Sequence, residues 1–205
     1  MNFKLFTIGH STHPIDYFIE LLSHYSVNCV VDVRSVAASR FNPQYNKKAL
    51  ANSLKDHGIV YLHFGEEFGA RRSDPDVLDD EGRVDFQKVR DSEKFAKGVD
   101  RIFKGAEDGY IIALMCSEAD PLSCHRFSMI SVALKDFEIL HILKDKSIIT
   151  QGELEDKLMN QYAGKLPKRD IFNSTTRDEQ LTHAYKLLNK SVAYSPVAHA
   201  KGFRK

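Results

Sequence analysis

The chain has 205 residues, of which 42% are hydrophobic and 28% charged, and its formal net charge is +1 at pH 7. These values predict one globular α/β domain with a tail, and they exclude a protein that attracts polyanions through its overall charge. No apolar stretch approaches the roughly 20 residues of a membrane-spanning helix, and the first residues lack the pattern of a signal peptide. Three cysteines in no disulfide-rich spacing suit a reducing compartment, so we expect a cytoplasmic protein with no membrane partner.

Apolar residues along the chain predict alternating strands and helices. Short apolar runs indicate strands, whereas apolar residues spaced by three and four indicate helices. In chain order we expect a strand over Leu5–Ile8, a helix from Pro14 to Tyr25, a strand over Cys29–Val33, a helix over Lys47–His57, a strand over Ile59–Phe64, a mobile loop over Ser73–Val84, a helix over Phe86–Ala106 broken near Gly98, a strand over Tyr110–Met115, a helix from Asp120 to Lys135, a strand over Glu138–Leu143 and a helix over Glu153–Met159.

Alternation at this spacing is typical of βαβ units with right-handed crossovers. We therefore predict the α/β class, with a three-layer sandwich around a mostly parallel, Rossmann-like sheet of five or six strands. The first strand should lie centrally, beside strand 110–115. Residues 1–159 are expected to form a single α/β domain.

Residues 160–205 are predicted to form a basic C-terminal appendage, because they carry nine Lys or Arg and three Asp or Glu. Apolar residues repeat from Asp178 to Leu188 at helical spacing, which predicts one short helix docked on the domain or on a partner. We expect this helix to serve assembly or polyanion binding but not the chemistry, with mobile ends beyond Tyr194.

The segment from Leu114 to Arg126 concentrates the residues with reactive side chains. Cys116 and Glu118 follow the predicted strand directly, and Asp120 before Pro121 is typical of a helix start. The next helix would then carry Cys124, His125 and Arg126 in its first turns. The N-terminus of this helix would favour an anion or a thiolate nearby.

Polar side chains also follow the carboxyl ends of the other predicted strands. Open parallel sheets bind ligands at this edge, near the point where the strand order reverses. We therefore predict one concave site with Cys116, Glu118 and His125 as catalytic residues. The residues expected to bind an anionic substrate there are His10, Ser11, Asp32, Arg34, Arg40, Cys124 and Arg126.

Each group also has a purely structural interpretation. A lone histidine at a strand end is more often a hydrogen-bonded structural residue. Asp32 and Arg34 are equally suited to an ion pair that ties loops together. Arg71 with Arg72 is more typical of a solvated loop, and Cys29 inside a strand is typical of an inert core thiol.

Four sequence blocks resemble family 488 of the domains of unknown function, a bacterial and archaeal family, over about Phe3 to Met159. The blocks are Thr7–Ser11, Asp32–Ser35 with Ser39–Arg40, Cys116 with Glu118, and Cys124–Arg126. The chain departs from the family pattern at Ala37 or Ala38, where a proline is usual, and at Phe68–Ala70, where Leu-Gly-Gly is usual. The resemblance implies an α/β fold and a pocket lined by Cys, His and Arg, and some members carry a DNA-repair label.

Four functions fit these residues. The first is an enzyme, a cysteine-dependent hydrolase or transferase, acting on a phosphate-bearing or nucleotide-related substrate, with Cys116 as nucleophile and His125 or Glu118 moving protons. The second is a metal site of Cys116, Cys124 and His125 with His10 or His63, although Cys-x7-Cys-His is no standard zinc spacing. The third is a DNA-repair-associated protein that binds nucleic acid through the basic tail, and the fourth is a non-catalytic sensor. The sequence names no cofactor and no oligomeric state.

Overall fold

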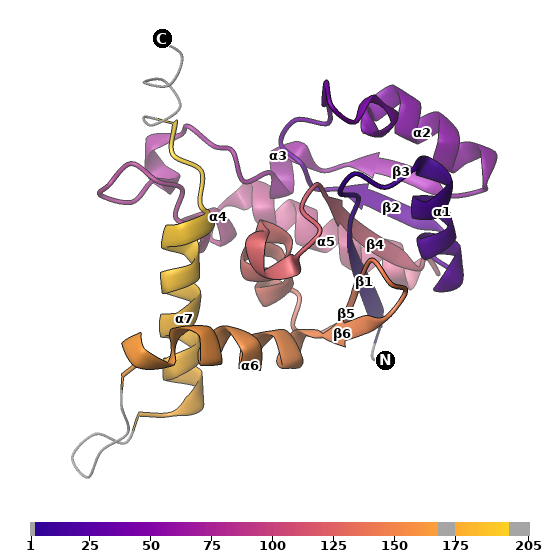
Figure 1. Ribbon diagram of the computed structural model, residues 1–205. Coiled ribbons are helices and arrows are strands. Elements are labelled where there is room, and N and C mark those ends of the chain that lie inside the picture. Colours follow the sequence, from indigo (N-terminus) through magenta and orange to yellow (C-terminus); the bar gives the residue numbers. More distant parts are fainter. Residues whose placement is uncertain (1–2, 168–174, 197–205) are drawn as a thin grey trace.

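The computed structural model describes residues 3–167 and 175–196 (Figure 1). A six-stranded sheet with the order β3-β2-β4-β1-β5-β6 forms its centre. The strands are β1 (Lys4–Gly9), β2 (Cys29–Asp32), β3 (Val60–His63), β4 (Ile112–Cys116), β5 (Glu138–Ile142) and β6 (Ile148–Thr150). All neighbouring pairs are parallel except β5 with β6. The predicted fold class is confirmed, and β1 lies beside β4 as expected.

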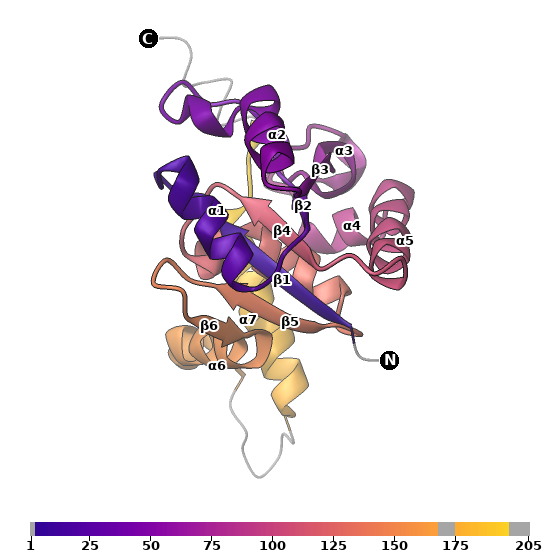
Figure 2. The same ribbon diagram turned by 90° about the vertical axis from the view of Figure 1, so that its right-hand side faces the viewer.

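Helices cover both faces of the sheet and make it the middle of three layers (Figure 2). They are α1 (Ile15–His24), α2 (Lys47–Asp56), α3 (Gly65–Phe68), α4 (Phe86–Arg90), α5 (Glu93–Glu107), α6 (Gln151–Tyr162), α7 (Arg177–Val192) and the π-helix η4 (Arg126–Ser131). Helices α1 and α2 pack on one face, and α4, α5 and η4 pack on the other. Within residues 3–167 and 175–196, no helix combines the length and the apolar character needed to cross a membrane.

Successive strand residues point to opposite faces, and helices cover both faces of the central strands. The sequences of these strands are therefore nearly continuous apolar runs. Leu5 and Leu114 enter the core shared with α5, whereas Phe6 and Ala113 enter the core shared with α1 and α2. All four side chains are buried. The edge strand β3 differs, because alternate residues such as Val60 stay partly exposed.

The predicted break near Gly98 is wrong. The break falls at Ser92, whose side chain accepts a hydrogen bond from the Phe95 N–H at 3.4 Å and thereby caps the start of α5. Gly98 instead lies inside α5, where a Cβ atom would come within 2.8 Å of the Phe68 ring. Its role is therefore close packing of α5 on α3.

The strand β6 was not predicted, because three residues after a turn carry little periodic signal.

The predicted helix from Asp120 to Lys135 is also wrong at its start. Asp120 and Pro121 begin only a 3-10 turn, η3 (Pro121–Ser123), with the Asp120 carboxylate accepting from Leu122 N–H at 3.0 Å. Cys124 then adopts extended dihedrals, φ −133° and ψ 141°. This extended residue separates the turn from the π-helix, so Cys124 does not occupy a helical first turn.

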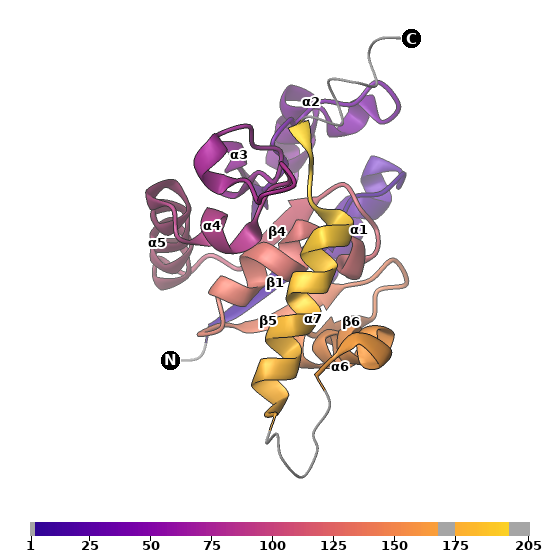
Figure 3. The same ribbon diagram turned by 90° about the vertical axis from the view of Figure 1, so that its left-hand side faces the viewer.

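The C-terminal helix α7 runs alongside the domain and crosses α6 (Figures 1 and 3). Ala184 and Leu188 are buried in a small apolar cluster with Phe127 and with residues of α6. Arg177 at the start of α7 pairs with Asp156 of α6 at 2.5 Å. The division of the chain at residue 160 stays a prediction. The expectation of mobile ends mainly concerns residues 197–205, which lie outside the described residues.

The topology places the carboxyl end of β4 at the reversal of strand order. The chain leaves β1 and β2 towards α1 and α2 on one face, but leaves β4 towards η4 on the other. Because β4 lies between β1 and β2, the loop after Cys116 sits where such sheets open a crevice. Gly9 allows the close approach of β1 to this loop, since a Cβ there would lie 1.8 Å from the Glu118 carbonyl oxygen.

Candidate functional site

A cavity of about 430 Å³, here called the thiol pocket, opens beyond the carboxyl end of β4. Its walls come from the loops after β2, β3 and β4 and from the chain that follows α7. The lining residues are Arg34, Ser35, Val36, Ala38, Ser39, Ala70, Arg71, Cys116, Ser117, Glu118, Ser123, Cys124, His125, Val192 and Tyr194. The pocket therefore gathers groups from three strand ends and from the C-terminal segment.

Two thiols and one imidazole form the reactive centre of this pocket. The sulfur atoms of Cys116 and Cys124 each lie 3.8 Å from His125 Nδ1, and the three atoms lie within 4.8 Å of one another. The Nε2 atom of His125 faces the Val33 carbonyl at 3.2 Å, an arrangement in which Nε2–H donates and Nδ1 turns towards the sulfurs. The Cys116 sulfur also lies 2.8 Å from a carboxyl oxygen of Glu118.

The charge pattern assigns the thiolate to Cys124. Burial by itself raises the pKa of the Cys124 thiol, but the hydrogen bond from Cys116 and the charges of Arg126 and His125 lower it well below its ordinary value. The same hydrogen bond, together with burial, raises the pKa of Cys116 well above its ordinary value. The charge of Arg126 also acts to lower the pKa of Cys116, but the hydrogen bond and burial outweigh it.

Arg126 supplies a buried positive charge with no carboxylate partner among the described residues. Its side chain is 0% exposed. Its terminal nitrogens donate to the carbonyls of Glu118 and Ala119 at 2.6 and 3.0 Å, and its Nε has no partner. An uncompensated buried charge is costly. A thiolate at Cys124, whose sulfur also faces the Arg126 backbone N–H at 3.5 Å, provides the missing negative charge.

Glu118 and His125 have pKa values suited to moving protons. Burial raises the pKa of the Glu118 carboxyl, and the neighbouring Cys124 charge adds to this effect. Burial lowers the pKa of His125, but the Cys124 thiolate outweighs it, so the pKa of His125 is raised. A buried thiol with a lowered pKa, beside an imidazole and a carboxyl with raised pKa values, is an arrangement suited to nucleophilic and acid–base chemistry.

Asp32 and Arg34 form a buried ion pair beneath the pocket. The Arg34 Nε and Nη2 atoms donate to the two Asp32 oxygens at 2.8 and 2.6 Å, and Tyr61 donates to the same carboxylate at 2.7 Å. Arg34 Nη1 also faces His10 Nε2 at 3.2 Å. His10 stacks on Tyr45 with ring centroids 4.0 Å apart. This network holds the loop after β2 in place and leaves Arg34 lining the pocket.

The structure brings only part of the predicted site residues to the cavity. Those lining the thiol pocket are Cys116, Glu118, His125, Arg34 and Cys124. His10, Asp32 and Arg126 are buried behind its wall. Ser11 makes backbone contacts with Ser117 and with His10 Nδ1 outside the lining, and Arg40 is exposed outside the lining. The two histidines weighed as further metal ligands, His10 and His63, do not join the Cys116–Cys124–His125 group.

Sequence reasoning missed several residues of the pocket wall. Arg71, read as part of a solvated loop, lines the cavity, and its guanidinium has no ion pair with any residue that the structure describes. Its place after the carboxyl end of β3 is the signal that would have found it. Val192 and Tyr194 also line the pocket, and the Val84 N–H donates to the Tyr194 carbonyl at 2.9 Å. The C-terminal segment therefore reaches the pocket, and the expectation that it takes no part in the chemistry stays a prediction.

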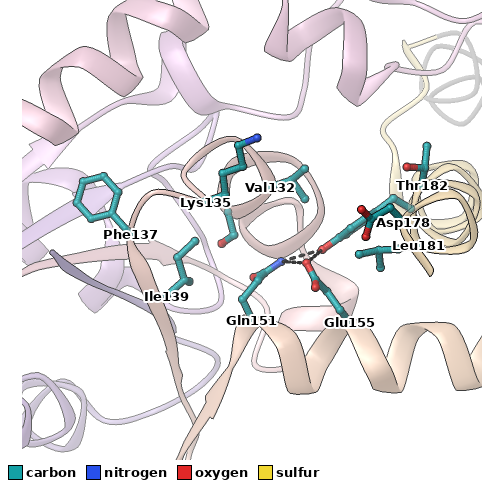
Figure 4. Close-up of a pocket in the computed structure, with 11 residues that line it drawn as sticks. Val132, Lys135, Phe137, Ile139, Gln151, Glu155, Asp178, Leu181 and Thr182 are labelled. Atoms are coloured by element: carbon teal, nitrogen blue, oxygen red, sulfur yellow. Dashed lines mark hydrogen bonds between the residues drawn. The ribbon is translucent and has the colours of Figure 1, made fainter. Parts of the chain in front are cut away.

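A second cavity, of about 410 Å³, lies between η4, β5, α6 and α7 (Figure 4). Its polar groups are used by one another: Gln151 donates to the Tyr185 hydroxyl at 2.8 Å, and Tyr185 donates to Glu155 at 2.9 Å. Gln151 also binds the buried His141 through its carbonyl oxygen at 2.9 Å. None of the predicted site residues lines this cavity, so we place the chemistry in the thiol pocket.

The assignment of the thiolate predicts how the three cysteines alkylate. We expect iodoacetamide to modify Cys124 at a nearly constant rate from pH 6 to pH 8, because a lowered pKa keeps its thiolate populated throughout. Burial raises the pKa of Cys29 to about 11, so Cys29 and Cys116 should react at least about tenfold more slowly. Peptide mass spectrometry after timed labelling of the native protein measures each rate. Faster labelling of Cys116 than of Cys124 would contradict the assignment.

A family model matches the part of the chain that carries most of the pocket residues. Residues 14–133 match the domain of unknown function DUF488, a span that includes the loop after β2, Arg71 and the whole Cys116–Arg126 segment. Neither the curated proteins nor the solved structures contain a significant match. Because the matched span covers more than half of the chain, the protein belongs to the DUF488 family.

Proposed function

We propose that this protein is a cysteine-dependent enzyme, a hydrolase or transferase, that acts on a phosphate-bearing or nucleotide-related anion in the thiol pocket. The observation that carries the proposal is the position of Cys124. Its sulfur lies 3.8 Å from His125 Nδ1, beside the unpaired buried Arg126, on the wall of a 430 Å³ cavity. A thiolate held by two cations and open to a cavity is the arrangement that activates a cysteine nucleophile.

The neighbouring groups have distinct parts in such a reaction. The Cys124 thiolate attacks the electrophilic centre of the substrate, and the Glu118 carboxyl, whose raised pKa favours its protonated form, protonates the leaving group. His125 keeps the thiolate in place through Nδ1. Water or a second substrate then attacks the covalent intermediate, with Glu118 taking up the proton. The sequence predicted Cys116 as the nucleophile, whereas we assign that role to Cys124.

Arg71 and the serine hydroxyls are the groups that would hold the anion. Arg34 has most of its N–H groups committed to Asp32, to His10 and to the Tyr45 carbonyl. The Arg71 guanidinium has no such commitment, and Arg71 reaches the pocket from the loop after β3, where its backbone N–H donates to Ser35 Oγ at 2.8 Å. Four serines line the same cavity: Ser35, Ser39, Ser117 and Ser123. One free guanidinium with several hydroxyls is suited to a phosphate group.

Thermal-shift measurements with inorganic phosphate and adenosine monophosphate test the anion site. We expect the melting temperature of the full chain to rise with the logarithm of ligand concentration, because the ligand binds the folded state. Arg71→Ala should abolish the rise. Arg40→Ala removes an equal charge from an exposed position outside the lining and should preserve it. Equal shifts in both variants would show that the anion binds elsewhere.

A metal site is the second candidate, because three donor atoms lie within 4.8 Å of one another. Structural zinc sites use four protein ligands, whereas catalytic ones use three. Metal analysis of the purified chain separates the two candidates. One zinc ion per chain would contradict a free Cys124 nucleophile, and a metal-free chain with a fast-reacting Cys124 supports it.

The three cysteines are free thiols, which favours action in the reducing cytoplasm.

A further inference from the structure

We propose that Cys116 and Cys124 form a reversible disulfide when the protein meets a hydroperoxide, so that the thiol pocket carries a built-in oxidation site. The inference rests on the proposed function in one respect, the reactive thiol at Cys124. Its geometric basis is separate: two sulfur atoms from different parts of the chain lie within 4.8 Å of each other and share one imidazole nitrogen.

The two cysteines lie in segments of different secondary structure. Cys116 ends the central strand β4 and is fixed by its neighbours in the sheet. Cys124 lies between the turn η3 and the π-helix η4, in an extended conformation that belongs to neither element. A disulfide requires the sulfurs to approach to about 2.05 Å. The linking segment around Cys124 can supply that movement without breaking a strand.

The chemistry follows the order of a reactive and a resolving cysteine. The Cys124 thiolate attacks one oxygen of hydrogen peroxide, the O–O bond breaks, and Cys124 becomes a sulfenic acid while hydroxide leaves and takes a proton from solvent as water. The Cys116 sulfur then attacks the Cys124 sulfur, the S–O bond breaks, and the second oxygen leaves as water with the Cys116 proton. Two electrons pass from the sulfurs to the peroxide, and two waters are the products.

The pocket explains why this pair, and not Cys29, would react. Cys116 and Cys124 both line the cavity through which a small oxidant enters. Cys29 lies in β2 within the apolar core and does not line the thiol pocket. The disulfide would also remove the negative charge that faces the buried Arg126. We therefore expect it to be reduced readily, as strained or unfavourably placed disulfides are.

The test uses the full chain treated with hydrogen peroxide, followed by alkylation in denaturant and peptide mass spectrometry. We expect free thiols to fall from three to one per chain, a Cys116–Cys124 linked peptide, and complete recovery with dithiothreitol. Cys29→Ser is the matched control and should form the same linked peptide. Cys116→Ser should instead leave a Cys124 sulfenic acid that dimedone traps, and Cys124→Ser should keep its two thiols.

Two results would overturn the inference: three free thiols after treatment of the wild-type chain, or dimedone labelling of Cys124 that is as high in wild type as in Cys116→Ser. The second result would mean that Cys116 does not resolve the sulfenic acid. None of these readouts needs a substrate. If the disulfide forms but phosphate does not stabilise the chain, the inference stands and the proposed enzyme function fails. If phosphate stabilises the chain but no disulfide forms, the proposed function stands and the inference fails.

Discussion

Replacing Asp32 by alanine is expected to lower the free energy of unfolding by about 3–5 kcal/mol, because it strands a buried charge. Asp32 is 0% exposed and Arg34 is 5% exposed. The Asp32 carboxylate accepts from Arg34 Nε, from Arg34 Nη2 and from the Tyr61 hydroxyl. Without it, the guanidinium keeps only the Tyr45 carbonyl and His10 as partners. Urea unfolding with an unchanged slope measures the loss.

Two further variants make this prediction specific to the buried pair. Asp32→Ala combined with Arg34→Met should lose less than Asp32→Ala alone, because removing both charges leaves none unpaired. Glu93→Gln breaks an exposed ion pair, because the Glu93 and Lys97 side chains are 83% and 67% exposed. This variant should leave the unfolding midpoint nearly unchanged. If the double variant is as unstable as the single one, the loss comes from packing and not from the stranded charge.

Acidification is expected to destabilise the fold between pH 6.5 and pH 4 through two buried histidines. Burial lowers the pKa of His10 and of His141 from 6.5 to about 4. In this window the unfolded chain binds a proton on each histidine that the folded chain does not. The contribution of each of these histidines to the free energy of unfolding should therefore hold above pH 6.5 and fall by about 3 kcal/mol towards pH 4.

His141 offers the cleaner test, because it lies outside the thiol pocket. It bonds Thr7 Oγ1 at 2.8 Å and Gln151 at 2.9 Å, contacts that a neutral imidazole makes with one donor and one acceptor nitrogen. Chemical denaturation of wild type and His141→Gln at a series of pH values gives the two profiles. The variant should lose stability less steeply with acid, by about 3 kcal/mol over the window. Parallel profiles would assign the acid sensitivity to other groups.

The periodic parts of the fold could be predicted from the sequence. The runs at Leu5–Ile8, Cys29–Val33 and Ile112–Met115 are buried on both faces, and burial on both faces selects the unbroken apolar runs that identify them. Alternation with helices then implied parallel strands with their carboxyl ends at one edge. That rule predicted Cys116 and Glu118 at the carboxyl edge of the sheet, where both line the thiol pocket, because a strand end is a local property of the chain.

The reactive centre could not be derived in the same way, because it depends on contacts between distant segments. Asp120 and Pro121 carry the local signal of a helix, yet the segment after them holds Cys124 extended, beside Cys116 and the buried Arg126. Arg71 and Tyr194 reach the pocket from loops with no periodic pattern. The sequence determined which residue types follow each strand, since strand ends follow from hydrophobic periodicity. Only the tertiary structure decided which cysteine faces the cations, since charge and burial there depend on what the folded chain packs around it.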